Sequence, residues 1–427
     1  MKRFITLLAM AALVLGTVAP ASADLAVKAA GAWRVHGNVL SNFGDFDDDT
    51  SSVYNDTFTI QHRMRTQLRF VYNENVMGEL YTEYGNVTWG QGAGTYGVRD
   101  NNAASELHIK RAFIQFRWPE TDLLTTVGEQ DITFPSSGAF SSMVQGGEDA
   151  GAIAVSTPLT DVLGLTLVYT RLAETTAQTS GNDFDVFLAA VPVKLEGMTI
   201  APWFSYAMVG QNSGFNTDND NANIWWAGAG FNMTALDPIV IYADFVYGSA
   251  DDGYTGLADG TSGFMIDAMV EFKGLDFATL QGFGVYSSQN DDGDGAMPHI
   301  DSDWTIGGSM INGSTFTTDL GPAAPGFWMV GAAARKIQFL DKLSHDVIAL
   351  YAKGTGDAAG FGGDNFGSSL PGLTSDDSYW EVDLNTRYQI YESLAAIVEL
   401  GYGKPDFDAG GADDATMKAA FGFLYRF

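Results

Sequence analysis

Basic side chains recur at alternate positions early in the chain, and Arg63, Arg65 and Arg69 are the densest group. If residues 58–72 form a β-strand, these arginines share one face, with alternate side chains about 7 Å apart. Guanidinium groups bind carboxylates and phosphates through paired hydrogen bonds. Neighbouring segments add cations to form a basic wall of Lys28, Arg34, Arg63, Arg65, Arg69, Lys110, Arg111 and Arg117. We interpret this wall as the lining of a polar interior, where pairing with nearby acids is the alternative role.

Acidic residues flank a stretch that carries few charges of its own, from about Asp131 to Glu148. The stretch is rich in Gly, Ser and Phe, so it can fold into an interior without a large cost of desolvating charge. Its ends supply a predicted acidic rim of Glu129, Asp131, Glu148 and Asp149. Acids on one side of a gap and arginines on the other would set a transverse field, which favours small polar solutes.

Catalytic motifs are missing from the sequence. There is no Gly-x-Ser-x-Gly elbow, His-Glu-x-x-His motif or phosphate loop, and the five histidines are scattered. Asp291, Asp292 and Asp294 offer oxygen ligands to a hard cation such as Ca²⁺, but the distal Glu of an EF-hand loop is missing, and a solvated loop tip is the alternative. We therefore predict no enzyme and no cofactor other than this Ca²⁺ candidate.

The charge balance and the cysteine count exclude further classes. The net charge is −30, whereas a nucleic-acid partner needs clustered Lys and Arg on one face. The chain has no cysteine, so disulfides do not hold the fold.

Apolar residues oppose the arginines within the same segment. Phe58, Ile60, Met64, Leu68, Phe70 and Tyr72 share the other face of 58–72, and residues 379–390 and 394–402 alternate in the same way. A charge facing lipid costs about 2–4 kcal/mol at the membrane midplane, so the charged faces must point into a lumen. Between Ile109 and Ala112 the apolar parity switches, which predicts a β-bulge.

Short and long connections alternate along the chain. Eight short turns are predicted near residues 74, 119, 160, 196, 236, 275, 341 and 392. Nine longer, polar connections lie between them, so we predict about eighteen strands, or sixteen if two weak segments belong to loops. The fold class is all-β, a transmembrane antiparallel up-and-down β-barrel with short periplasmic turns and long extracellular loops.

Both ends of the chain carry export and assembly features. Residues 1–23 have a basic start, an apolar run and a small-x-small cleavage site, so we expect a signal peptide followed by a single domain, 24–427. The last segment places Phe423, Tyr425 and Phe427 on one aromatic face, which resembles the assembly signal of Gram-negative outer-membrane proteins.

These features together resemble a general porin of the Gram-negative outer membrane. The narrower resemblance is to the acidic homotrimeric porins of sulfate-reducing bacteria. Val127-Gly128-Glu129-Gln130 and Phe134-Pro135-Ser136-Ser137-Gly138 resemble the porin strand that leads into an inward-folded third loop. The resemblance implies a water-filled channel for passive diffusion of ions and small hydrophilic solutes. It also implies a homotrimer, outer-membrane lipid and lipopolysaccharide as surroundings, and the outer-membrane assembly machinery as a partner.

Two other functions fit the same sequence. A substrate- or phosphate-selective channel is supported by the basic wall. A structural or adhesive surface barrel is supported by acidic loops that could bind lipopolysaccharide through divalent cations.

Overall fold

The computed structural model describes residues 25–43, 46, 57–90, 107–174, 183–211, 221–251, 260–288, 295–300, 304–305, 310–311, 313–316, 320, 326–356, 373–408 and 413–427. The predicted signal peptide lies outside these residues. The strands are β1 (Ala26–Ser41), β2 (Thr57–Asn73), β3 (Val76–Thr88), β4 (Leu107–Arg117), β5 (Leu124–Thr133), β6 (Gly146–Pro158), β7 (Gly164–Glu174), β8 (Asp183–Ala190), β9 (Val193–Leu195), β10 (Met198–Val209), β11 (Ala222–Leu236), β12 (Ile239–Ala250), β13 (Thr261–Leu275), β14 (Ala278–Ser287), β15 (Phe327–Leu340), β16 (Leu343–Gly354), β17 (Ser378–Tyr391), β18 (Leu394–Asp406) and β19 (Thr416–Arg426).

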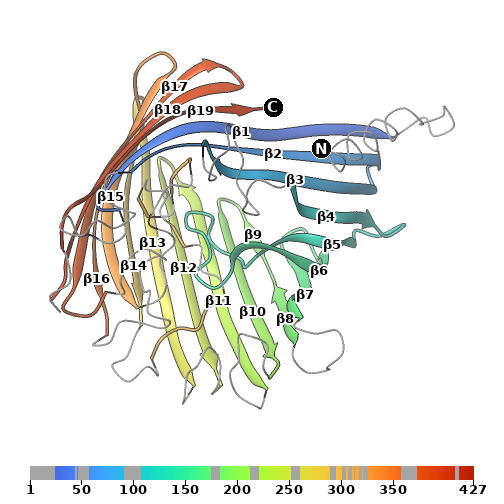
Figure 1. Cartoon of the computed structure of the whole chain (residues 1–427). Helices are drawn as coiled ribbons and strands as arrows, with labels where there is room; N and C mark the ends of the chain where they lie inside the picture. The colour runs from blue at the N-terminus through green and yellow to red at the C-terminus, as the bar shows by residue number, and fades with distance from the viewer. Residues whose placement is uncertain are drawn as a thin grey trace.

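The strands form one closed antiparallel barrel. Each strand pairs with its neighbours in chain order, and β1 pairs with both β2 and β19, which closes the sheet (Figure 1). Elements β8 and β9 both pair with β10, so they are two parts of one strand, interrupted around Pro192. Nineteen elements therefore make eighteen strands, which confirms the predicted fold class.

The connections alternate in length as predicted. The β2–β3 link is residues 74–75, and the β13–β14 link is residues 276–277, whereas the β14–β15 connection runs from 288 to 326. All eight predicted short turns separate consecutive strands of the barrel. The eight short turns join sixteen strands as antiparallel neighbours, and β1 and β19 bring the number to eighteen.

Side chains alternate between an apolar outer face and a mixed inner face. In β19, Met417, Phe421 and Phe423 are exposed, whereas Lys418 and Ala420 are each 2% exposed. Outward aromatic pairs are spread over β10 to β18: Phe204–Trp225, Trp225–Tyr247, Phe264–Tyr286, Trp328–Tyr351 and Trp380–Tyr402. This arrangement matches the period-two pattern, because successive strand residues point to opposite faces.

A β-bulge lies where the apolar parity switches. The β3–β4 register moves from Tyr81↔Arg111 to Thr82↔Ile109, so Lys110 and Arg111 together oppose one residue of β3. The predicted bulge is confirmed. It brings two consecutive cations of the basic wall to the same part of the sheet.

No helix in the described part of the chain is long and apolar enough to cross a membrane.

The seam between β1 and β19 depends on the last residue. The Gly31 N–H donates to Phe427 O at 3.0 Å, and the Phe427 N–H donates to Gly31 O at 3.2 Å. The Phe427 ring packs edge-on against Trp33, with 5.4 Å between centroids. A Cβ at Gly31 would lie 2.5 Å from the backbone oxygen of Arg65, so only glycine lets β1 pass this closely.

Deleting Phe427 should lower the amount of folded barrel in the membrane fraction. The deletion removes two seam hydrogen bonds and an aromatic pair that contributes about 0.5–1.5 kcal/mol. Heat-modifiable mobility on gels measures the folded fraction. Phe245→Leu, at an outward position on β12, serves as control, and equal folding of the two variants would contradict the role of Phe427.

Candidate functional site

The third loop, residues 134–145 between β5 and β6, lies inside the barrel. Phe134 packs edge-on against Trp203 and Trp226, which point inward from β10 and β11, with 5.3 and 6.0 Å between ring centroids. The Ser137 N–H donates to Asp244 Oδ1 of β12 at 2.6 Å, and the Ser137 hydroxyl donates to the other carboxylate oxygen. Gly138 turns the loop with φ +88°. The loop thus reaches the far wall at β12.

A second connection also enters the lumen, which the sequence analysis missed. In the seventh loop, described at 295–300, 304–305, 310–311, 313–316 and 320, Trp304 Nε1 donates to Asp267 of β13 at 2.9 Å. Further along, the Thr315 N–H donates to Glu399 of β18 at 2.7 Å. Trp304, Met310 and Phe316 are fully buried in the structure. The presence of these large apolar residues in a connection was a sequence signal that the loop packs inside the barrel. The acidic residues at the start of the loop had suggested a solvated segment.

The two inner loops contact each other. Phe140 stacks on Trp304 with 5.5 Å between centroids, and the Ile300 N–H donates to Val144 O at 2.9 Å. The loops are held to the wall by carboxylates that accept their N–H and O–H groups, among them Asp244, Asp267 and Glu399. These contacts satisfy charges that would be costly to bury alone.

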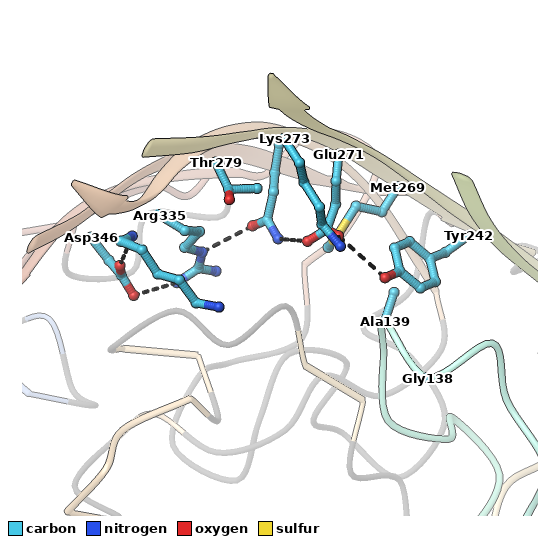
Figure 2. Close-up of a pocket in the computed structure, with 11 residues that line it drawn as sticks. Gly138, Ala139, Tyr242, Met269, Glu271, Lys273, Thr279, Arg335 and Asp346 are labelled. Carbon is cyan, nitrogen blue, oxygen red and sulfur yellow. Dashed lines mark hydrogen bonds and ion pairs between the residues drawn. The ribbon is translucent and has the colours of Figure 1, made fainter. Parts of the chain in front are cut away.

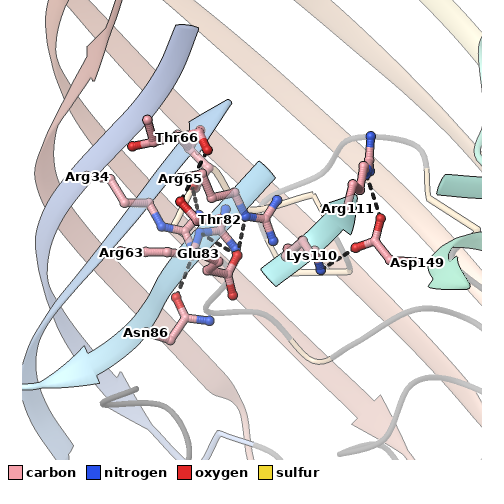
Figure 3. A network of polar contacts seen from close by, with 11 residues as sticks. Arg34, Arg63, Arg65, Thr66, Thr82, Glu83, Asn86, Lys110, Arg111 and Asp149 are labelled. Carbon is pink, nitrogen blue, oxygen red and sulfur yellow. Dashed lines mark hydrogen bonds and ion pairs between the residues drawn. The ribbon is translucent and has the colours of Figure 1, made fainter. Parts of the chain in front are cut away.

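The basic wall is paired with acids on the next strand. Arg65 bonds to Glu83 (Figure 3). Arg69 Nε lies 2.9 Å from Glu79 Oε2. Arg63 lies 4.0 Å from Glu83. The sequence analysis did not select Glu79 or Glu83, although the predicted turn near residue 74 sets this register and could have found both.

Arg34 connects the basic wall to the seventh loop. Its guanidinium donates to Thr315 O at 2.5 Å. It also donates to Asn86 Oδ1 at 2.9 Å (Figure 3). His36, two residues further along β1, stacks on Phe316 with 4.5 Å between centroids. Arg34 therefore serves as an anchor for a loop, in addition to lining the lumen.

Two further members of the basic wall, Lys28 and Arg117, lie elsewhere along their strands. Lys28 is exposed and pairs in register with Arg69. Arg117 lies 3.5 Å from Asp122, beside the β4–β5 turn. Neither residue joins the cluster of Arg63 and Arg65.

Asp131 and Asp149 contact the basic wall directly, whereas the sequence suggested that they face it across a gap. Asp149 lies 2.9 Å from Lys110 and 2.6 Å from Arg111, and Asp131 lies 2.8 Å from Arg111. Backbone pairing of β4 with β5 ends at Ala112↔Glu129, so these ion pairs join the strands where the ladder stops.

Glu129 does not join the acidic rim. It pairs in register with Gly151, two residues from the Val127↔Ile153 pair, and Ile153 is 46% exposed on the outer face. Glu129 is exposed on that same face, because side chains two apart in a strand point the same way. Two predictions lie outside the described residues. One is the side chain of Glu148 in the acidic rim, and the other is the Ca²⁺ candidate Asp291, Asp292 and Asp294. Within the described residues no cluster of His, Cys, Asp or Glu is suited to a metal ion.

A row of polar side chains crosses the lumen wall from β12 to β16, and the sequence analysis missed it. We call Tyr242, Glu271, Lys273, Gln281, Arg335 and Asp346 the polar row (Figure 2). Tyr242 donates to Glu271 at 3.2 Å, Gln281 donates to Glu271 at 2.7 Å, and Arg335 Nε donates to Gln281 at 2.9 Å. The row lines a cavity of about 400 Å³ that the tip of the third loop closes on one side.

The barrel resembles several solved structures, although the sequences are far apart. OpdL of Pseudomonas aeruginosa has a TM-score of 0.57 at 12% identity, over 94% of this chain and 98% of that chain. OpdK of the same organism, solved with vanillate, has 0.55 at 11%, over 94% and 98%. OccAB3 of Acinetobacter baumannii has 0.56 at 7%, over 94% and 99%. No protein-family model and no curated protein matches the sequence. These likenesses show the fold of nearly the whole chain.

Replacing Asp244 by Ala should release the third loop. The substitution leaves the N–H and hydroxyl of Ser137 without their acceptor, which costs about 1–3 kcal/mol when such groups are buried. Because the chain has no cysteine, a spin label at Ala139→Cys reports only on this loop. We expect a more mobile label in the Asp244→Ala background. The matched control is Asp276→Ala in the β13–β14 turn, and a label equally immobile in all backgrounds would contradict the anchor.

Proposed function

We propose that the protein is a porin of the Gram-negative outer membrane, a water-filled channel for passive diffusion of ions and small hydrophilic solutes. The observation that carries this proposal is the two-faced wall of a closed barrel. Aromatic and aliphatic residues such as Phe421 and Val330 are exposed outside, while charged residues such as Arg63 and Glu271 point inside. A lipid-facing exterior around a polar interior is the design of outer-membrane barrels.

The fold likeness supports a path for small solutes. OpdK, a barrel of similar fold, was solved with vanillate. Transport through the lumen, without catalysis, is therefore the function we assign. The signal peptide, homotrimeric assembly and surrounding lipopolysaccharide belong to the same proposal. The signal peptide follows from the pattern of residues 1–23, and the other two follow from the sequence resemblance. A relationship to the homotrimeric porins of sulfate-reducing bacteria stays a prediction.

We assign the constriction to the two inner loops. The third loop is held at β12 by Asp244. The seventh loop reaches the inner face of other strands, at Arg34 of β1 and Glu399 of β18. Arg63, Arg65 and Arg69 share the inner face with Glu79 and Glu83, so the local charge is largely balanced. Weak ion selectivity follows, and the acidic chain as a whole tilts it toward cations at low salt.

Purified protein in liposomes should admit small sugars. Swelling in isotonic solutions of arabinose and of larger oligosaccharides measures the permeability and its size limit. We expect rates that fall with solute size, because a narrow aqueous path hinders larger solutes. Tight liposomes containing correctly folded barrel would favour the structural alternative.

Replacing Arg63, Arg65 and Arg69 together by Ala should increase the preference for cations and widen the pore. The change removes three cations and leaves Glu79 and Glu83 without their partners. Reversal potentials in a KCl gradient measure the selectivity, and single-channel conductance measures the width.

The matched variant for this experiment is Glu79→Gln with Glu83→Gln, which should shift the reversal potential the opposite way. If both variants keep the wild-type conductance and reversal potential, the basic wall lies away from the permeation path.

A further inference from the structure

We propose that the polar row is a binding subsite for linear zwitterions whose ammonium and carboxylate groups are several ångströms apart, such as short peptides. This inference deepens the proposed function and rests on it, since the solute must enter the lumen. It assigns a solute class to the cavity of about 400 Å³ between the wall and the third loop. Cavities of roughly 300–1,000 Å³ hold small ligands.

The first argument is the order of charges along the row. Figure 2 shows Asp346 and Arg335 at one end, Lys273 and Glu271 further along, and Tyr242 beyond them. Gln281 lies between the pairs, because it bonds to both Glu271 and Arg335. Figure 2 also shows Thr279 between them. Each end therefore holds both signs of charge, and the middle holds an amide and a hydroxyl that match a peptide group.

The second argument is which members of each pair reach the cavity. The side chains of Arg335 and Glu271 are each 13% exposed, whereas Lys273 is 47% and Asp346 is 34% exposed. Within the two ion pairs, the cation Lys273 is the more exposed member at one end and the anion Asp346 at the other. The exposed Lys336 also lines the cavity beside Asp346. A solute carboxylate would meet Lys273, and a solute ammonium would meet Asp346.

The third argument is the separation of the two ends. Lys273 lies on β13 and Asp346 on β16, three strand spacings apart. At about 4.8 Å per spacing the backbones are on the order of 14 Å apart, and the two side chains shorten the gap. An α-amino acid is too short to reach both ends, whereas a dipeptide or tripeptide is long enough.

The fourth argument is charge balance on binding. A zwitterion offers its carboxylate to Lys273 and its ammonium to Asp346, so each charge of the solute meets an opposite charge. A simple anion meets Lys273 but is repelled by Asp346, and a simple cation has the reverse problem. The row is held by its own hydrogen bonds from Tyr242 to Arg335, so it needs little rearrangement to receive a solute.

Planar-bilayer recordings test the subsite in two stages. The first stage measures single-channel current in KCl without added solute, and its absence overturns the proposed function itself. The second stage adds triglycine, N-acetyltriglycine, triglycinamide or N-acetylglycinamide, which are zwitterionic, anionic, cationic and neutral. We expect triglycine alone to reduce the current in a saturable manner at low concentration, with half-saturation at least about tenfold below the other three.

Substitutions at the two ends complete the test. Lys273→Met and Asp346→Asn should each raise the half-saturating triglycine concentration by about tenfold. The matched controls are Lys404→Met and Asp276→Asn, which make the same changes outside the cavity, and they should keep the wild-type value. KCl current of each variant verifies that its barrel is folded.

Two results would overturn the inference while the pore itself stands. One is equal or stronger block by N-acetyltriglycine, which would mark an anion site. The other is an unchanged triglycine response in both Lys273→Met and Asp346→Asn.

Discussion

Backbone hydrogen bonding between neighbouring strands is the interaction on which the rest of the structure depends. A chain in hydrocarbon has no water to satisfy its N–H and C=O groups, so a sheet there must close on itself. Closure falls on β1 and β19, whose pairing runs from Ala32↔Arg426 to Ser41↔Met417. The last residue extends this seam through its two hydrogen bonds with Gly31. The interruption between β8 and β9 keeps the register with β10, and the bulge at Lys110–Arg111 shifts the register by one residue. Both leave the ring of strands complete.

Closure creates an interior in which buried polar groups need partners, either from water or from the protein. Inward carboxylates meet this need by accepting hydrogen bonds from loop backbone and side chains. Asp244 holds the third loop, while Asp267 and Glu399 hold the seventh. Neither loop belongs to the sheet, yet both are fixed to it at several strands. The inner surface of the barrel is therefore set as much by anchored loops as by the barrel wall.

Charges inside the barrel are arranged in pairs, and this gives the lumen its chemical character. Arg65 with Glu83 and Arg69 with Glu79 balance each other across one hairpin. The polar row repeats this balance on the other side of the barrel, with its pairs connected through Gln281. Such a lining can exchange hydrogen bonds with passing polar solutes without exposing a large field of one sign. Selectivity then depends on which member of each pair is accessible.

The sequence by itself determined the local pattern: the strands, the turns, the two faces of each strand and the bulge near Lys110. These features repeat with a period of two or depend on a few adjacent residues, so one strand at a time is enough to read them. The Arg–Glu pairs of β2 and β3 were also within reach, because a tight turn sets the register of its hairpin. Only the tertiary structure decided that Asp149 contacts Arg111, that the seventh loop crosses the lumen, and that side chains of β12 to β16 form one polar row. These contacts join residues tens to hundreds of positions apart. They depend on the stagger of many strands and on the path of irregular loops, which no local period encodes.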